Sequence, residues 1–153
     1  MLVTEGMEKI MRLWTKMAFL LLLVPLVASA QFKDLDAAMS NLTRGFTNGD
    51  VQAIVAGIGD GEQVMLEFPG MVDKRGFFGR DQAVYVLDEV FNKAKPTGFE
   101  QRKARKVSAE SQYHITARWT VEPAEQPEVR ELYITLREKN DRWSVASIRS
   151  SSK

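Results

Sequence analysis

Apolar residues recur at two different periods along the chain, and the change of period divides it into two parts. Between positions 35 and 58, and again between 83 and 94, they recur every three or four residues, which indicates amphipathic helices. From Thr97 onward apolar and polar residues alternate, which indicates strands. The pattern therefore predicts three helices, with one strand before the third of them, followed by a run of antiparallel strands.

Turn and cap signals set the limits of the three predicted helices. Asn48-Gly49-Asp50 ends the first helix, and Asp50 is placed to cap the second. Glycines at 57, 59 and 61 end the second helix, and Pro96 lies just beyond the third. The apolar stripes are Leu35, Ala38, Met39, Leu42 and Phe46; then Val51, Ile54, Val55 and Ile58; then Ala83, Val86, Leu87, Val90, Phe91 and Ala94.

The strands follow from the two-residue period. A first strand over 64–68 ends at Pro69, and residues 71–78 add a short strand or a turn. Asn140-Asp141 is a hairpin turn signal. Four further strands are predicted near 98–108, 111–121, 129–138 and 142–150.

This order of elements predicts an α+β fold, in which three helices pack on one face of a curved, mostly antiparallel sheet. The apolar face of the sheet is expected to meet the helices. The polar face is expected to meet water or a partner. It carries His114, Arg118, Lys103 and Arg105.

The first thirty residues have the layout of a secretory signal peptide. Lys9, Arg12 and Lys16 precede an eleven-residue apolar run over 17–27, and Ala28-Ser29-Ala30 follows as a cleavage site. The alternative is a membrane anchor, but a span needs roughly 20 apolar residues and Pro25 interrupts this run. We therefore expect 1–30 to be a signal peptide and 31–153 a single domain in the periplasm or outside the cell, with no transmembrane segment after cleavage.

Composition and charge exclude several classes of function. The chain has no cysteine, which excludes disulfides, thiolate metal sites and cysteine nucleophiles, and its single histidine excludes a multi-histidine metal centre. Residues 31–153 carry 18 basic and 18 acidic side chains, so nothing in their net charge favours nucleic acid as a partner. We expect no metal and no cofactor.

Three short sequence motifs, in their order along the chain, resemble those of the nuclear-transport-factor-2-like superfamily, which has the cystatin-like cone fold. They are Asn48-Gly49-Asp50-Val51 between two helices, the run from Val64 to Pro69, and Gly79-Arg80-Asp81-Gln82-Ala83 at the start of the third helix. The resemblance runs from about Lys33 to Ser150 and is strongest to an exported bacterial family of uncharacterised function. It implies a cone-shaped domain.

The resemblance also implies where catalytic groups would lie if the chain were an isomerase of that superfamily. The position of the general-base aspartate holds Phe68, and the position of the oxyanion-holding tyrosine holds Leu42. Neither side chain can transfer a proton. The related dehydratases use a pocket histidine, whereas His114 alternates with the apolar face and is expected to point away from the cavity.

Three polar side chains remain as catalytic candidates. Glu67 and Asp81 are the carboxylates nearest the expected pocket mouth, and Tyr85 follows on the same predicted helix as Asp81. Strand alternation also explains Glu67 as a solvent-facing residue, and the helix dipole explains Asp81 in a first turn.

Five apolar side chains are the candidates for lining a ligand pocket, with a filled core as the alternative. A basic run over 102–106 is expected on a solvated edge strand, and it could pair across a homodimer with the acidic residues Glu122, Glu125 and Glu128. The pocket candidates are Leu42, Phe46, Phe68, Phe91 and Trp119.

The sequence thus predicts an exported, non-enzymatic domain that binds a small apolar ligand or an envelope protein, and that forms a homodimer through its sheet. One alternative is an isomerase or lyase that uses pocket carboxylates. Another is a protein-interaction module that uses the sheet face and has no pocket.

Overall fold

The computed structural model describes residues 33–122 and 126–151. The predicted signal peptide, its cleavage site and Glu125 lie outside these residues. The helices are α2 (Leu35–Asn48), α3 (Val51–Val55), α4 (Arg80–Lys93) and the short 3-10 helix η1 (Ser108–Glu110). The strands are β1 (Val64–Glu67), β2 (Arg75–Phe78), β3 (Lys95–Val107), β4 (Gln112–Glu122), β5 (Glu128–Lys139) and β6 (Arg142–Ser150).

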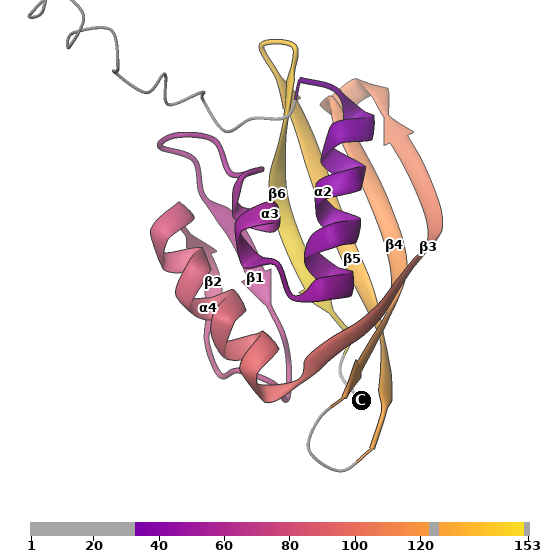
Figure 1. Cartoon of the computed structure of the whole chain (residues 1–153). Coiled ribbons are helices and arrows are strands. Elements are labelled where there is room, and N and C mark those ends of the chain that lie inside the picture. The colour runs from indigo at the N-terminus through magenta and orange to yellow at the C-terminus, as the bar shows by residue number, and fades with distance from the viewer. Residues whose placement is uncertain (1–32, 123–125, 152–153) are drawn as a thin grey trace, which may run out of the picture.

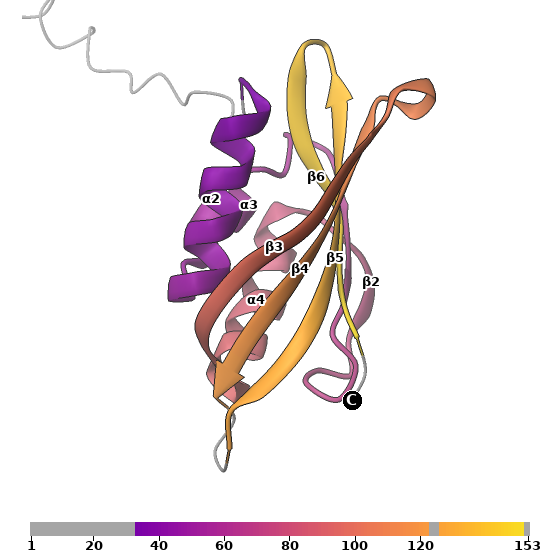
Figure 2. The same ribbon diagram turned by 90° about the vertical axis from the view of Figure 1, so that its right-hand side faces the viewer.

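The α-helices cover one face of a single curved sheet, as Figures 1 and 2 show from two sides. The six strands follow the order β2-β1-β6-β5-β4-β3. Neighbouring strands run antiparallel except β1 and β6, which are parallel. The predicted α+β fold of three helices on a curved, mostly antiparallel sheet is confirmed.

Local signals position the first two helices as expected. Asp34 caps α2, since its side chain accepts a hydrogen bond from the amide of Ala37. Gly49 ends that helix at a φ of 70°, and Asp50 caps α3. Helix α3 is shorter than the apolar stripe suggested: it ends at Val55 because glycine at 57 and 59 favours an irregular backbone.

The third helix is confirmed, but β3 begins at Lys95 rather than near 98 and so includes Pro96. Proline lacks an amide hydrogen, which excludes it from central strands. Strand β3 lies at the edge of the sheet and has register shifts at 96–98 and 101–103. An edge position explains why the strand can start at a proline.

The turn between β5 and β6 is the predicted one. Asn140 and Asp141 form a two-residue loop in which both residues have positive φ, 53° and 56°. This is the geometry of a type I′ hairpin, which asparagine and aspartate tolerate better than other non-glycine residues.

Asp141→Val is expected to destabilise the domain by about 1–2 kcal/mol, because a β-branched side chain is strained in the left-handed region. Thermal unfolding followed by circular dichroism would measure the change. Asp141→Gly is the matched control, since glycine adopts this φ freely and keeps the stability of the parent. Equal loss in both variants would contradict this account of the turn.

The two faces of the sheet separate apolar from polar side chains. On β4 the residues 115, 117, 119 and 121 are buried and face the helices, whereas His114 and Arg118 are exposed on the opposite side. We call that opposite side the outer face. In the part of the chain that the structure describes, no helix has the length and apolar composition of a membrane span.

Candidate functional site

The structure brings all five pocket candidates together between the sheet and the helices. Phe46 comes from α2, Phe91 from α4 and Trp119 from β4, and Phe68 follows β1. The ring of Trp119 lies 5.5 Å from Phe46, 6.1 Å from Phe91 and 6.2 Å from Phe68, in edge-to-face contact each time. Aromatic rings at these separations attract one another. We call this group, with Leu42, the aromatic cluster.

The aromatic cluster is closely packed and poor in polar groups. Leu42, Phe46 and Trp119 are 0% exposed and Phe68 is 1% exposed. The indole nitrogen of Trp119 donates a hydrogen bond to the carbonyl of Phe46 at 3.0 Å. Phe91 is half-buried at the rim of the group, as is Phe99, whose ring stacks on Phe46. The cluster presents carbon, and carbon neither gives nor takes a proton.

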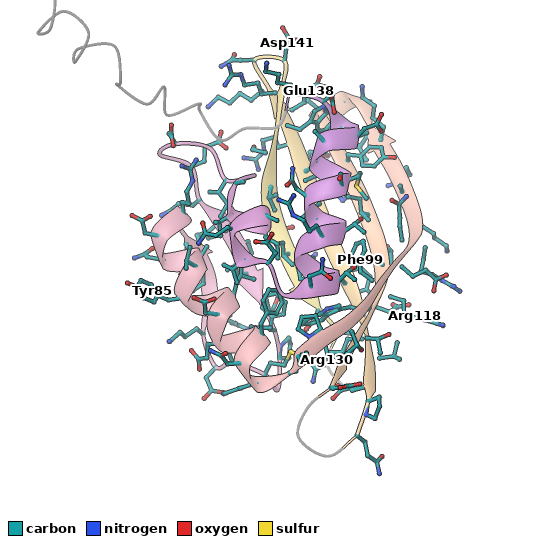
Figure 3. All side chains as sticks on the ribbon, viewed as in Figure 1. Tyr85, Phe99, Arg118, Arg130, Glu138 and Asp141 are labelled. Atoms are coloured by element: carbon teal, nitrogen blue, oxygen red, sulfur yellow. The ribbon has the colours of Figure 1, made fainter. Side chains whose placement is uncertain are left out.

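The three catalytic candidates are not brought to one site. Glu67 lies on the outer face, where its carboxylate is 3.6 Å from the guanidinium of Arg75. Asp81 is exposed in the first turn of α4. Tyr85 is 74% exposed and extends from α4 into solvent, as Figure 3 shows. None of them lies against the aromatic cluster in the way that proton transfer to a bound substrate would require.

A buried ion pair that the sequence analysis missed lies on the inner face of the sheet. Arg130 is 5% exposed, and its Nε is 2.7 Å from a carboxylate oxygen of Glu128. Its Nη1 donates hydrogen bonds to the carbonyls of Pro69, at 2.6 Å, and Ser151, at 3.2 Å. The guanidinium therefore joins β5 to the loop after β1 and to the residue that follows β6.

The two-residue period of β5 could have predicted that this ion pair is buried. Leu132, Ile134 and Leu136 face the core, and Arg130 and Glu128 precede them at the same two-residue spacing. Arg130 is also directly opposite Trp119 in the register of β4 and β5. By its sequence, Glu128 belongs to an acidic loop that could pair with the basic run across a homodimer. In the structure Glu128 begins β5, and its carboxylate lies 2.7 Å from Nε of Arg130.

The outer face combines exposed rings with charged side chains. Cross-strand neighbours share a face, so the register places Arg149, Tyr133 and Thr116 in one row and Met65, Ser147 and Thr135 in the next. Tyr133 is 41% exposed and Phe77, at the β2 end of the second row, is 66% exposed. Exposed rings of this size are typical of binding surfaces rather than of catalytic sites.

Two hollows lie along β6 on this face. The first has a volume of about 400 Å³ and the second about 380 Å³. The first includes Phe77, Arg137, Lys139, Ser144 and Ala146 in its lining; the second is lined by Glu67, Pro69, Tyr133, Arg149 and Ser150.

A third hollow, of about 470 Å³, lies at the start of α4 and includes Asp81. Its cation, Arg80, is already bound to the carbonyl of Ile58 and to Asp60. The acidic side chains near it do not form a metal site: among residues 33–122 and 126–151, no group of three or more histidine, aspartate or glutamate side chains could hold an ion.

Tyr133, on the outer face, has a perturbed pKa. Its hydroxyl donates a hydrogen bond to Glu131 at 2.7 Å, and this bond raises the pKa of Tyr133 above its ordinary value, because ionisation would lose the bond and place two negative charges together.

Spectrophotometric titration is expected to show Tyr133 ionising above the usual tyrosine range, and Glu131→Gln should bring its pKa down. Because the folded pKa is raised, the stability that this bond contributes is present at neutral pH and is lost as pH rises through the folded pKa. Tyr133→Phe identifies the signal. A titration that Glu131→Gln leaves unchanged would contradict the assignment.

Comparison with known proteins identifies relatives by family and by fold. Residues 39–150 match the family described as a domain of unknown function, DUF4783. A DUF4783 family protein from Bacteroides ovatus has a similar structure, with a TM-score of 0.61 at 18% identity over 74% of this chain and 94% of that one. No curated protein sequence matches the chain.

Two further solved structures share the fold at low identity. A protein of unknown function from Shewanella oneidensis, described as similar to nuclear transport factor 2, has a TM-score of 0.57 at 19% identity, over 76% of this chain and 98% of that one. A Catenulispora acidiphila protein with a ketosteroid isomerase-like fold, in complex with trimethylamine, has a TM-score of 0.59 at 11% identity, over 76% and 85%. The resemblance to the nuclear-transport-factor-2-like fold is thereby confirmed.

Proposed function

We propose that this chain, which belongs to the DUF4783 family of unknown function, is an exported, non-enzymatic domain that binds an envelope protein through the outer face of its sheet. One observation carries the proposal. Exposed rings and two hollows lie together on the outer face, whereas Leu42, Phe46, Phe68 and Trp119 pack closely on the inner face.

The positions of the polar side chains support a binding role over catalysis. Leu42 and Phe68 stand where related isomerases carry their proton-transfer groups, and both are buried against other carbon. Glu67, Asp81 and Tyr85 lie on separate parts of the surface. General acid–base catalysis needs such groups within hydrogen-bond reach of one bound substrate.

Site-specific photo-cross-linking tests which face binds a partner. With p-benzoylphenylalanine in place of Tyr133, we expect a discrete cross-linked product in cells of the source organism, because the ring at this position would lie inside the interface. The same replacement at Tyr85, the matched exposed tyrosine on the helix side, should give no such product. Cross-linking at Tyr85 alone, or at neither position, would overturn the proposal.

Export of the protein is tested separately, by the mass of the processed product. Expression of the full chain in a bacterium with an intact export route is expected to give a product whose mass begins at Gln31, since Ala28-Ser29-Ala30 is the predicted cleavage site. Intact-mass spectrometry of the periplasmic fraction would show it. An uncleaved product would refute export with cleavage, and Ala30→Arg should block processing if the site is correct.

A second candidate function is binding of a small apolar ligand at the aromatic cluster. It is favoured by the half-buried rings of Phe91 and Phe99 at the rim of the cluster, and by the trimethylamine complex of the Catenulispora acidiphila protein. Native mass spectrometry of the purified protein tests it. Bound mass that is lost in Phe91→Ala would favour this function, and an unliganded protein would count against it.

A further inference from the structure

We infer that the partner contacts the outer face with an acidic, extended peptide segment that lies along β6. This inference rests on the proposed function and names the chemistry of the partner. Three features of the described residues carry it: the charges left unpaired on the outer face, the shape of the surface along β6, and the distribution of charge along the chain.

Three carboxylates of the outer face already have partners, whereas Glu122 and, in the lining of the first hollow, Glu62 form no ion pair among the described residues. Glu67 pairs with Arg75, Glu100 pairs with Arg102 at 2.9 Å, and Glu131 accepts a hydrogen bond from Tyr133. They hold little capacity for a further ligand.

Two cations, Arg75 and Arg102, form these ion pairs, but six other cations of the outer face do not. Six exposed basic side chains form no ion pair among residues 33–122 and 126–151. We call them the outer-face cations. They are Lys103, Arg105, Arg118, Arg137, Lys139 and Arg149.

The register confirms that these cations share one face. Lys103 is opposite Thr116, Arg105 is opposite His114, and Arg149 is opposite Tyr133. Arg118 extends away from the helices, as Figure 3 shows. A surface that leaves more cations than carboxylates without an ion pair attracts a negatively charged partner.

The neutral net charge conceals this asymmetry. Residues 31–94, which supply the helices and the two short strands, carry 10 acidic and 6 basic side chains. Residues 95–153, which supply the four long strands, carry 8 acidic and 12 basic side chains. The charge therefore favours an acidic partner on the long strands, even though the sum over the domain is zero.

On the outer face, the surface over β6 is recessed relative to the surface on both sides of this strand. In the middle of β6 the outward residues are small, with Ser144 and Ser147 on either side of the register shift near Ala146 and Arg149 beyond them. Larger side chains stand on both sides: Tyr133 and Arg137 on β5, and, on the other side, Phe77 on β2, one strand beyond β1. The two hollows lie at the two ends of this strip, which we call the β6 groove.

The β6 groove has the dimensions of a short extended peptide. From Ser144 to Arg149 a strand covers about 17 Å at roughly 3.3 Å per residue. A cation stands at each end, Arg137 with Lys139 in the first hollow and Arg149 in the second. An extended segment can place an acidic side chain at each end, and the exposed ring of Phe77 can contact an apolar one.

The same features disfavour nucleic acid and anionic membrane as the partner. Both present a dense row of negative charge, which would meet the carboxylates of Glu67, Glu100 and Glu131 as well as the cations. A peptide can keep its acidic residues at the cations and place neutral residues opposite the carboxylates. The outer face also offers discrete hollows rather than a continuous basic stripe.

Charge reversal in the first hollow tests the inference in cells. In the double variant Arg137→Glu, Lys139→Glu, the cross-linking yield from position 133 is expected to fall at least fivefold. The matched control Lys33→Glu, Lys93→Glu reverses two exposed cations elsewhere and should leave the yield unchanged. Arg137→Gln, Lys139→Gln gives an intermediate loss if charge, rather than local shape, is responsible.

A binding assay with purified protein supplies the second measurement. The probe is a six-residue peptide in which glutamate alternates with phenylalanine, and titration calorimetry measures its Kd. We expect the double charge reversal to weaken this Kd at least tenfold, and a peptide with glutamine in place of glutamate to bind at least tenfold more weakly. A 20-nucleotide DNA duplex and vesicles containing phosphatidylglycerol serve as the competing polyanions.

The outcomes separate the inference from the proposed function. Cross-linking at position 133 that survives the double reversal would overturn the acidic segment and leave outer-face binding intact. If no cross-linked product forms from position 133 in a protein without the charge reversals, the proposed function itself is overturned. Binding of the duplex or the vesicles as tightly as the acidic peptide, or no detectable peptide binding at millimolar concentration, would also overturn the inference.

Discussion

Arg130→Ala is expected to lower the free energy of unfolding by about 3–5 kcal/mol. A domain of this size is stable by only about 5–15 kcal/mol, so the variant should unfold at a much lower urea concentration. The loss has a definite cause. Removing the guanidinium takes the cation away from the carboxylate of Glu128 and the hydrogen-bond donor away from the carbonyl of Pro69, both in a buried place.

Matched variants separate a buried charge from a lost contact. Arg118→Ala removes an exposed arginine from the neighbouring strand and should change stability by less than about 0.5 kcal/mol. The double variant Glu128→Gln, Arg130→Met removes both charges and is expected to recover much of the loss, because no uncompensated charge stays buried. If Arg130→Ala unfolded at the same urea concentration as the parent, the ion pair would have no structural role.

Gly45→Ala is expected to destabilise the domain by about 1–3 kcal/mol, although alanine is the better helix former. Gly45 is buried where α2 meets the chain that leads into α3. A Cβ added there would overlap Cγ1 of Ile54 and lie 2.9 Å from its Cδ1 and 3.1 Å from the carbonyl of Asp50. Ile54 is 0% exposed and cannot move aside without disturbing the core.

A double-mutant cycle with Ile54→Ala tests this steric account. In the Ile54→Ala background the overlapping atoms are gone, so Gly45→Ala should become neutral or stabilising there, by up to about 1 kcal/mol. Gly98→Ala is the control glycine, because its Cβ would meet Thr120 at an ordinary 3.5 Å. A loss at Gly45 that persists in the Ile54→Ala background would show that steric overlap is not its cause.

The period of apolar residues predicted the elements well, because burial of one face decides which residues must be apolar. It correctly assigned the outward side chains of β4, such as His114 and Arg118. It did not predict that β6 lies between β1 and β5, because alternation tells which face a side chain takes but not which strand lies beside it.

The candidate sites could be predicted only in part, because the alternation of apolar residues gives the face of a side chain but not its neighbours from distant parts of the sequence. The aromatic cluster followed from apolar positions, but Arg130 was overlooked because a charged side chain suggests solvent, although its spacing from Leu132 placed it inward. The first hollow joins Phe77 to Arg137, which lie far apart in the sequence. No local pattern could associate these two residues, since only the sheet brings them together.

The place of β6 in the sheet has a consequence for the order of folding. Strand β6, which comes after the other five described strands in the sequence, is paired on both sides, in parallel with β1 and antiparallel with β5. The sheet therefore cannot close until residues 142–150 have left the ribosome, and contacts between distant parts of the chain slow folding. For the exported protein that we propose, such late closure keeps the chain unfolded while it crosses the membrane, and a chain truncated before Arg142 should not fold.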